Sequence, residues 1–160
     1  MAKVALIVSS NNRRGQGHLA RCLNIRKKLN KNVVWFIDSD DNNLIPKNDI
    51  VVKIKKISLK KILDFLSSYY ISLVVIDSYD ISNKIKTKIS KKVKVIAIED
   101  TLTQIGGCKV IFPHPITVHK NNNIHTGIKY AAVDTKKKKK IEKYFYIKKK
   151  IKYFNKYGLL

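Results

Sequence analysis

Short apolar runs that end in polar residues constrain the fold of this chain more than any other feature. Three of them carry no charge, Val4–Val8, Val33–Ile37 and Leu73–Ile76, and two more, Ile50–Ile54 and Val93–Ile98, each contain one lysine. Runs of this length without alternation are typical of strands buried on both faces, which occur in parallel sheets. The sequence therefore predicts a parallel sheet with both faces covered.

Residues with helical spacing separate these runs. We expect a first helix over His18–Asn30, a second after a Ser58 cap and a third after Ile81. The apolar stripes are Leu19, Cys22, Leu23 and Leu29, then Leu59, Ile62, Leu63, Leu66 and Tyr70, and lastly Ile81, Ile85 and Ile89. Val110–Phe112 and Tyr130–Val133 are expected to add short strands.

Alternating strands and helices predict a doubly wound, mostly parallel, Rossmann-like α/β domain. Ligands in such sheets lie beyond the carboxyl ends of the strands. We therefore expect four polar segments to meet at one edge of the sheet, namely residues 9–18, 38–41, 77–80 and 99–101.

The chain has 160 residues, of which 44% are hydrophobic, and this suits one packed core. We expect residues 1–135 to form that domain. Residues 136–160 begin with five consecutive lysines and include apolar residues such as Ile141 and Tyr144. This composition predicts a Lys-rich tail, helical or solvated, that could contact an anionic membrane.

The net charge of +23 raises the question of nucleic acid or an anionic membrane as a partner. Only four of the 34 basic residues are arginine, and all four lie between residues 13 and 26. Arginine is preferred for bidentate contacts to bases and phosphates. Lysine spread over the whole chain also follows from A/T-rich coding, so the charge gives weak support to nucleic-acid binding.

Cys22 and Cys108 have neither disulfide nor metal-ligand spacing, which favours a reducing, cytoplasmic location. Val4–Val8 is too short for the core of a signal peptide, and no run approaches the roughly 18 apolar residues of a membrane span. The three histidines within residues 114–125 have no carboxylate beside them, so we expect neither a metal site nor a cofactor.

The sharpest local motif is Arg14–Cys22, R-G-Q-G-H-L-A-R-C, between the first strand and the first helix. Gly15 and Gly17 allow a sharp turn and close approach to a ligand, and a helix N-terminus presents N–H groups to anions. His18 opens the helix, where imidazolium is disfavoured, so we expect a neutral ring that can accept a proton. A tight turn and a histidine that caps its own helix would give the same pattern.

Further segments join this motif in a series. Gly15–Leu23, Val74–Tyr79, Ile98–Asp100, Cys108 and Gly127–Ala131 together resemble the N-terminal half of the UDP-2,4-diacetamido-2,4,6-trideoxy-β-L-altropyranose hydrolases of pseudaminic acid synthesis. The wider group includes spore-coat polysaccharide proteins. The resemblance covers residues 3–134 in a consistent order.

The resemblance implies one half of a glycosyltransferase-B architecture, in which two Rossmann-like halves hold a nucleotide sugar between them. It implies that water attacks the anomeric carbon with inversion and releases UDP, with His18 as the catalytic base. The residues implied in substrate binding are Gly15, Gly17, Arg21, Asp77, Ser78, Tyr79, Glu99 and Asp100. For Glu99 and Asp100, a solvated strand end or a helix cap is the favoured alternative.

The chain departs from the family pattern at three places. Ile7 and Ser9 stand where the family has Arg and Asp, and Asp134–Thr135 runs into lysines where it has an Arg-Glu-Glu-Phe-like stretch. The half that holds the uridine diphosphate is not among these residues. We therefore expect either a split hydrolase whose nucleotide-binding half is a separate chain or a truncated hydrolase, and independent activity of this half is not expected. The alternatives are the acceptor-side subunit of a two-chain glycosyltransferase and a basic nucleic-acid-binding module.

Overall fold

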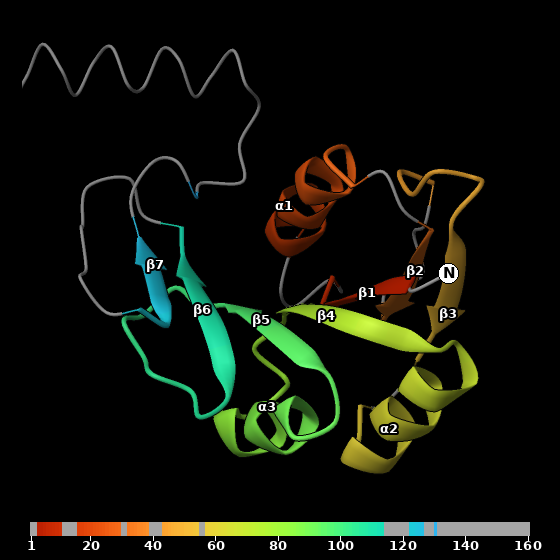
Figure 1. Cartoon of the computed structure of the whole chain (residues 1–160). Helices are drawn as coiled ribbons and strands as arrows, with labels where there is room; N and C mark the ends of the chain where they lie inside the picture. The colour runs from red at the N-terminus through yellow and green to blue at the C-terminus, as the bar shows by residue number, and fades with distance from the viewer. Residues whose placement is uncertain are drawn as a thin grey trace, which may run out of the picture.

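The computed structural model of the chain describes residues 3–10, 16–29, 32–38, 43–54, 57–113, 122–126 and 130. Its strands form one parallel sheet in the order β3-β2-β1-β4-β5-β6-β7 (Figure 1). The strands are β1 (Lys3–Val8), β2 (Val33–Ile37), β3 (Ile50–Lys53), β4 (Ile71–Asp77), β5 (Lys94–Ile98), β6 (Cys108–Phe112) and β7 (Ile124–Thr126). The order runs outward from β1 in both directions, as in a Rossmann-like domain, so the predicted fold class is confirmed.

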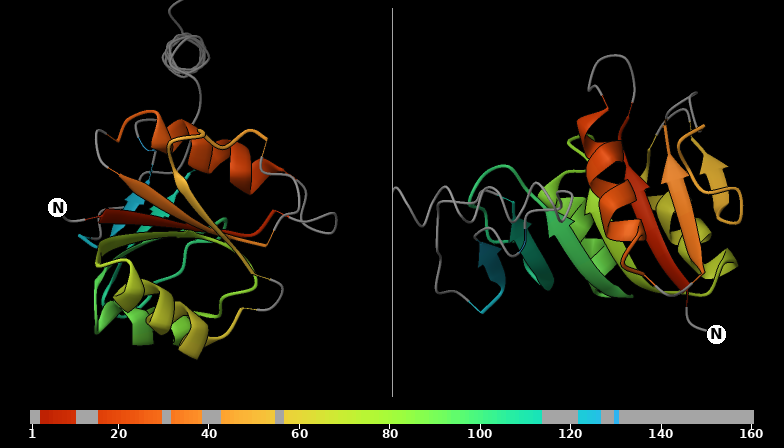
Figure 2. Two further views of the ribbon diagram at one scale, coloured as in Figure 1. Left: turned by 90° about the vertical axis from the view of Figure 1, so that its right-hand side faces the viewer. Right: turned by 90° about the horizontal axis from the view of Figure 1, so that it is seen from above.

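Helices cover both faces of this sheet. One face is packed by α1 (Gly17–Arg26), and the other by α2 (Leu59–Ser68) and α3 (Asn83–Ser90) (Figures 1 and 2). Successive residues of β1 alternate between the two cores, with Leu6 packed under α1 and Ile7 on the side of α2 and α3. Full burial of such a side chain contributes roughly 1.5–3 kcal/mol, which explains why the central strands are apolar throughout.

The predicted elements differ from the observed ones mainly at their ends. The Ser58 cap is confirmed, since its hydroxyl accepts a hydrogen bond from the Lys61 N–H at 3.3 Å. The first helix ends at Arg26 instead of Asn30, although Leu29 still packs against the core. β7 was not predicted, because Ile124 is its only strongly apolar residue.

Two predictions fall on residues that the structure does not describe. The tail 136–160 lies outside the described residues, and so does the predicted strand Tyr130–Val133 apart from Tyr130. In the described part of the chain, no helix combines the length and the apolar character needed to cross a bilayer.

Candidate functional site

The candidate site lies at the carboxyl ends of β1 and β4, where the strand order reverses. Parallel register places Val8, the last residue of β1, opposite Asp77, the last residue of β4. The Ser9 N–H donates to the Asp77 carbonyl oxygen at 3.3 Å, and the Ser9 and Ser78 hydroxyls hydrogen bond to each other. In α/β sheets this reversal opens the crevice in which ligands bind.

His18 and Asp77 form a buried pair at this point. His18 is the second residue of α1, and its Nδ1 lies 2.6 Å from Asp77 Oδ1. His18 is 6% exposed and Asp77 is fully buried. Asp77 and Arg21 lie on the Nδ1 side of the His18 ring, and the Tyr79 ring meets it edge-on.

The carboxylate determines which nitrogen of His18 carries the proton. Asp77 Oδ1 can only accept, so Nδ1 donates to it. Arg21 Nη2 lies 3.2 Å from the same Nδ1, but it already donates to Asp77 Oδ1 at 2.6 Å. Nε2 is therefore the atom that can take a proton, and within the described residues no hydrogen bond reaches it.

Arg21 holds the Asp77 carboxylate in place. Its Nε and Nη2 contact Oδ2 and Oδ1, each at 2.6 Å, and its Nη1 contacts Asp100 Oδ1 at 3.1 Å. Burial lowers the pKa of Arg21, but the hydrogen bond and charge of Asp77, followed by Asp100, outweigh burial and raise it overall. A guanidinium shared by two carboxylates positions the site and has little positive charge left for a phosphate.

Tyr79 and Asp100 form the outer part of the site. The Tyr79 hydroxyl donates to Asp100 Oδ2, and its ring meets the His18 ring edge-on with centroids 4.6 Å apart. The hydrogen bond to Asp100 raises the pKa of Tyr79. Burial raises the pKa of Asp100, but the Tyr79 hydrogen bond and the Arg21 charge exceed that effect and lower it overall. Tyr79 is 52% exposed and can therefore contact a ligand.

The remaining predicted residues have different surroundings. Gly17 begins α1, and a Cβ there would meet no described atom within 4 Å. Gly15 lies outside the described residues. Ser78 is buried and its hydroxyl also accepts from the Asp80 N–H at 3.2 Å. Glu99 is ion-paired with the buried Lys86 of α3.

Glu99 and Asp100 thus do not act as a pair of acids. Asp100 joins Arg21 and Tyr79 near α1, whereas Glu99 joins Lys86 from a helix on the opposite face of the sheet. Consecutive residues at a strand end point to opposite faces, which explains the separation. No group of three or more histidine, cysteine or carboxylate side chains could hold a metal ion among the described residues.

Sequence analysis missed the role of Cys22. Its Sγ lies 3.8 Å from Asp77 Oδ2, and burial, followed by the charge of Asp77, raises the pKa of this thiol well above its ordinary value. The thiol is therefore an uncharged neighbour of the carboxylate. His18, Arg21 and Cys22 are three or four residues apart and therefore lie on one helix face. This spacing is the signal from which the position of Cys22 beside Asp77 could have been predicted.

Acidic residues collect at this edge of a strongly basic protein. Of the seven acidic residues within the described ranges, five follow the carboxyl ends of strands: Asp38, Asp77, Asp80, Glu99 and Asp100. Arg21 pairs with Asp77 and Asp100, and Lys86 pairs with Glu99. Around Arg21 the described charges are two carboxylates and one guanidinium, which suit a neutral polyhydroxyl group better than a polyanion.

Comparison with known proteins adds no family to this picture. No protein-family model matches the chain, and a search of curated proteins finds no match either.

Proposed function

We propose that this chain is the sugar-binding half of an inverting nucleotide-sugar hydrolase. The observation that carries the proposal is the 2.6 Å contact of His18 Nδ1 with Asp77 Oδ1 at the reversal of strand order. This contact fixes the tautomer in which Nε2 accepts a proton. The family resemblance supports a UDP-linked diacetamido sugar as the substrate, and the two cysteines of the sequence, which lack disulfide spacing, favour a cytoplasmic location.

The chemistry follows from this arrangement. Water attacks the anomeric carbon and forms the new C–O bond, while the bond from that carbon to the phosphate oxygen breaks and its electron pair leaves with UDP. His18 Nε2 takes the proton of the attacking water, and Asp77 stabilises the imidazolium that forms. Inversion results because the water and the leaving group lie on opposite faces of the sugar.

The charge of the site indicates which part of the substrate this half binds. Arg21 is shared between two carboxylates, those of Asp77 and Asp100. Hydroxyl and amide groups of a sugar can donate to such oxygens, whereas a diphosphate would be repelled. We therefore assign the sugar to this half and the diphosphate to a separate nucleotide-binding partner.

The test compares His18→Gln with His125→Gln, a matched change of a histidine on β7. With the UDP-linked diacetamido sugar and the full chain, UDP release should fall by about 10²–10⁴-fold for His18→Gln and stay unchanged for His125→Gln. If the unsubstituted protein releases UDP and His18→Gln releases it at the same rate, the proposal is refuted.

A binding measurement covers the case in which the chain alone releases no UDP. Nitrogen NMR of the imidazole rings should show His18 shifting with the free diacetamido sugar and not with UDP. A shift with UDP alone, or none with the sugar, would contradict the assignment.

A further inference from the structure

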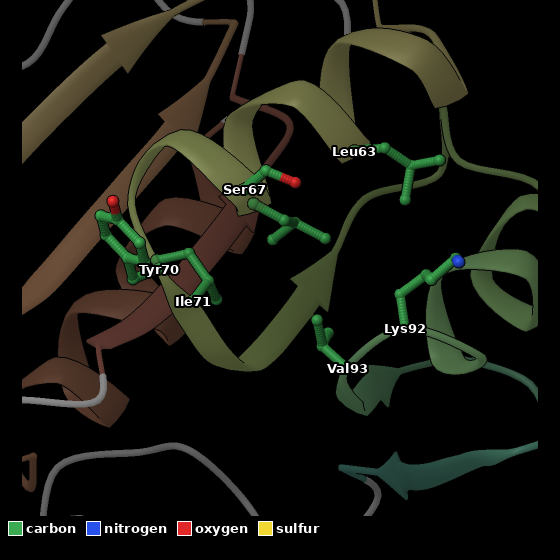
Figure 3. Close-up of a pocket in the computed structure, with 7 residues that line it drawn as sticks. Leu63, Ser67, Tyr70, Ile71, Lys92 and Val93 are labelled. Atoms are coloured by element: carbon green, nitrogen blue, oxygen red, sulfur yellow. The ribbon is translucent and has the colours of Figure 1, made fainter.

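A groove lies at the opposite, amino-terminal edge of the sheet. It has a volume of about 420 Å³ and lies between the end of α2, the start of β4 and the turn before β5 (Figure 3). Its lining is Leu63, Leu66, Ser67, Tyr70, Ile71, Lys92 and Val93. Four of these residues are aliphatic, so the groove offers an apolar floor with Tyr70 and Lys92 on opposite sides (Figure 3).

Tyr70 is an unusual residue for its position. It follows α2 with a φ of 53°, a left-handed conformation that favours glycine, and its side chain is 81% exposed. A tyrosine here adds backbone strain and makes little contact with the core. Its ring is apolar with a polar tip, as is typical of side chains at a membrane interface.

Exposed lysines lie close in sequence to Lys92, which lines one side of the groove. Lys88, Lys91 and Lys92 lie at the C-terminal end of α3, and Lys94 begins β5 beside them. Of the acidic residues described near this groove, Asp49 has a buried side chain paired with Arg26, and Asp64 of α2, next to Leu63, is exposed but is outnumbered by these lysines. The charge here is thus opposite to that of the candidate site at the far end of the strands.

We propose that this edge binds an anionic phospholipid surface. Lysines within reach of such a surface are attracted to the lipid headgroups, Tyr70 enters the interface, and the aliphatic groove receives apolar lipid groups. An acidic protein would be attracted by the lysines alone and would not need an exposed aromatic ring beside an apolar groove. With this edge on the membrane, the His18 site at the other end of the strands faces the aqueous phase.

The experiment measures binding of the full chain to vesicles of phosphatidylglycerol and phosphatidylcholine, with pure phosphatidylcholine vesicles for comparison. The triple variant Lys91→Gln, Lys92→Gln and Lys94→Gln should bind the anionic vesicles about 100-fold more weakly. The matched control replaces Lys60, Lys61 and Lys84, which lie at the other ends of α2 and α3, and should bind like the unsubstituted protein.

A second variant separates binding from folding. Tyr70→Gly relieves the left-handed strain, so thermal stability should hold or rise while vesicle binding falls several-fold. The proposal fails if both lysine triples lose binding equally, if Tyr70→Gly binds like the parent, or if only replacement of Lys136–Lys140 in the tail abolishes binding. Polyglutamate serves as the acidic-protein comparison. The proposal also fails if the protein binds polyglutamate as tightly as it binds the anionic vesicles and Tyr70→Gly weakens neither interaction.

Discussion

Arg21 and Arg26 lie on the same helix, and each forms a bidentate ion pair with a buried aspartate. Arg26 contacts Asp49 at 2.6 and 2.7 Å, much as Arg21 contacts Asp77. The third donor differs, because Asp49 accepts from the Trp35 indole at 2.9 Å and Asp77 accepts from His18. An indole N–H cannot take part in proton transfer, whereas an imidazole has a second nitrogen that can.

Position in the sheet reinforces this difference. Asp49 precedes β3 at the amino-terminal edge and ties α1 to the neighbouring strands, while Asp77 ends β4 at the strand-order reversal. The remaining nitrogen of Arg26 donates to the Leu29 carbonyl, and that of Arg21 to the Asp100 carboxylate. The same ion pair is therefore expected to be structural in one place and functional in the other.

The largest effect is expected for Asp77→Asn. The neutral amide leaves the Arg21 guanidinium without its buried charged partner. This loss should lower the free energy of unfolding by about 3–5 kcal/mol. An amide nitrogen can also face His18 Nδ1 and favour the wrong tautomer, so UDP release should fall by about 10²–10⁴-fold. Urea unfolding and a UDP-release assay measure the two effects. If Asp77→Asn keeps the full stability or the full rate of UDP release of the unsubstituted protein, the inferred difference between the Asp77 and Asp49 ion pairs does not hold.

Asp49→Asn should affect stability alone. Breaking the buried pair with Arg26 should cost about 3 kcal/mol, measured by urea unfolding, and should alter the emission of Trp35, the only tryptophan of the chain. UDP release by the folded fraction should match that of the unsubstituted protein. If release falls in a protein that is still folded, the Arg26 pair is not merely structural.

The sequence predicts which strands position the site better than it predicts the side-chain contacts within the site. Apolar runs indicate where β1 and β4 end, and this is sufficient to bring His18 and Asp77 to one edge. The partners of Arg21 depend on strand register and on the rotation of α1 about its axis, which residue spacing does not define. For the same reason the adjacent Glu99 and Asp100 looked alike in sequence and are separated by the sheet.

The smallest effect concerns the outer carboxylate, Asp100, for which the described residues show no counterpart beside Arg26. Its pKa is lowered in the folded protein because the Tyr79 hydrogen bond and the Arg21 charge exceed the effect of burial. Its ionised form therefore stabilises the fold above its ordinary pKa of 3.8, and this contribution is lost as the pH falls through the lower folded value. Asp100→Asn should cost under about 1 kcal/mol at neutral pH, since the side chain is 35% exposed and salt screens the pair. In urea titrations the difference between the two proteins should shrink below about pH 4 and at high salt. A difference that persists in acid would mean that packing, and not the charge of Asp100, holds Arg21 at the outer side of the site.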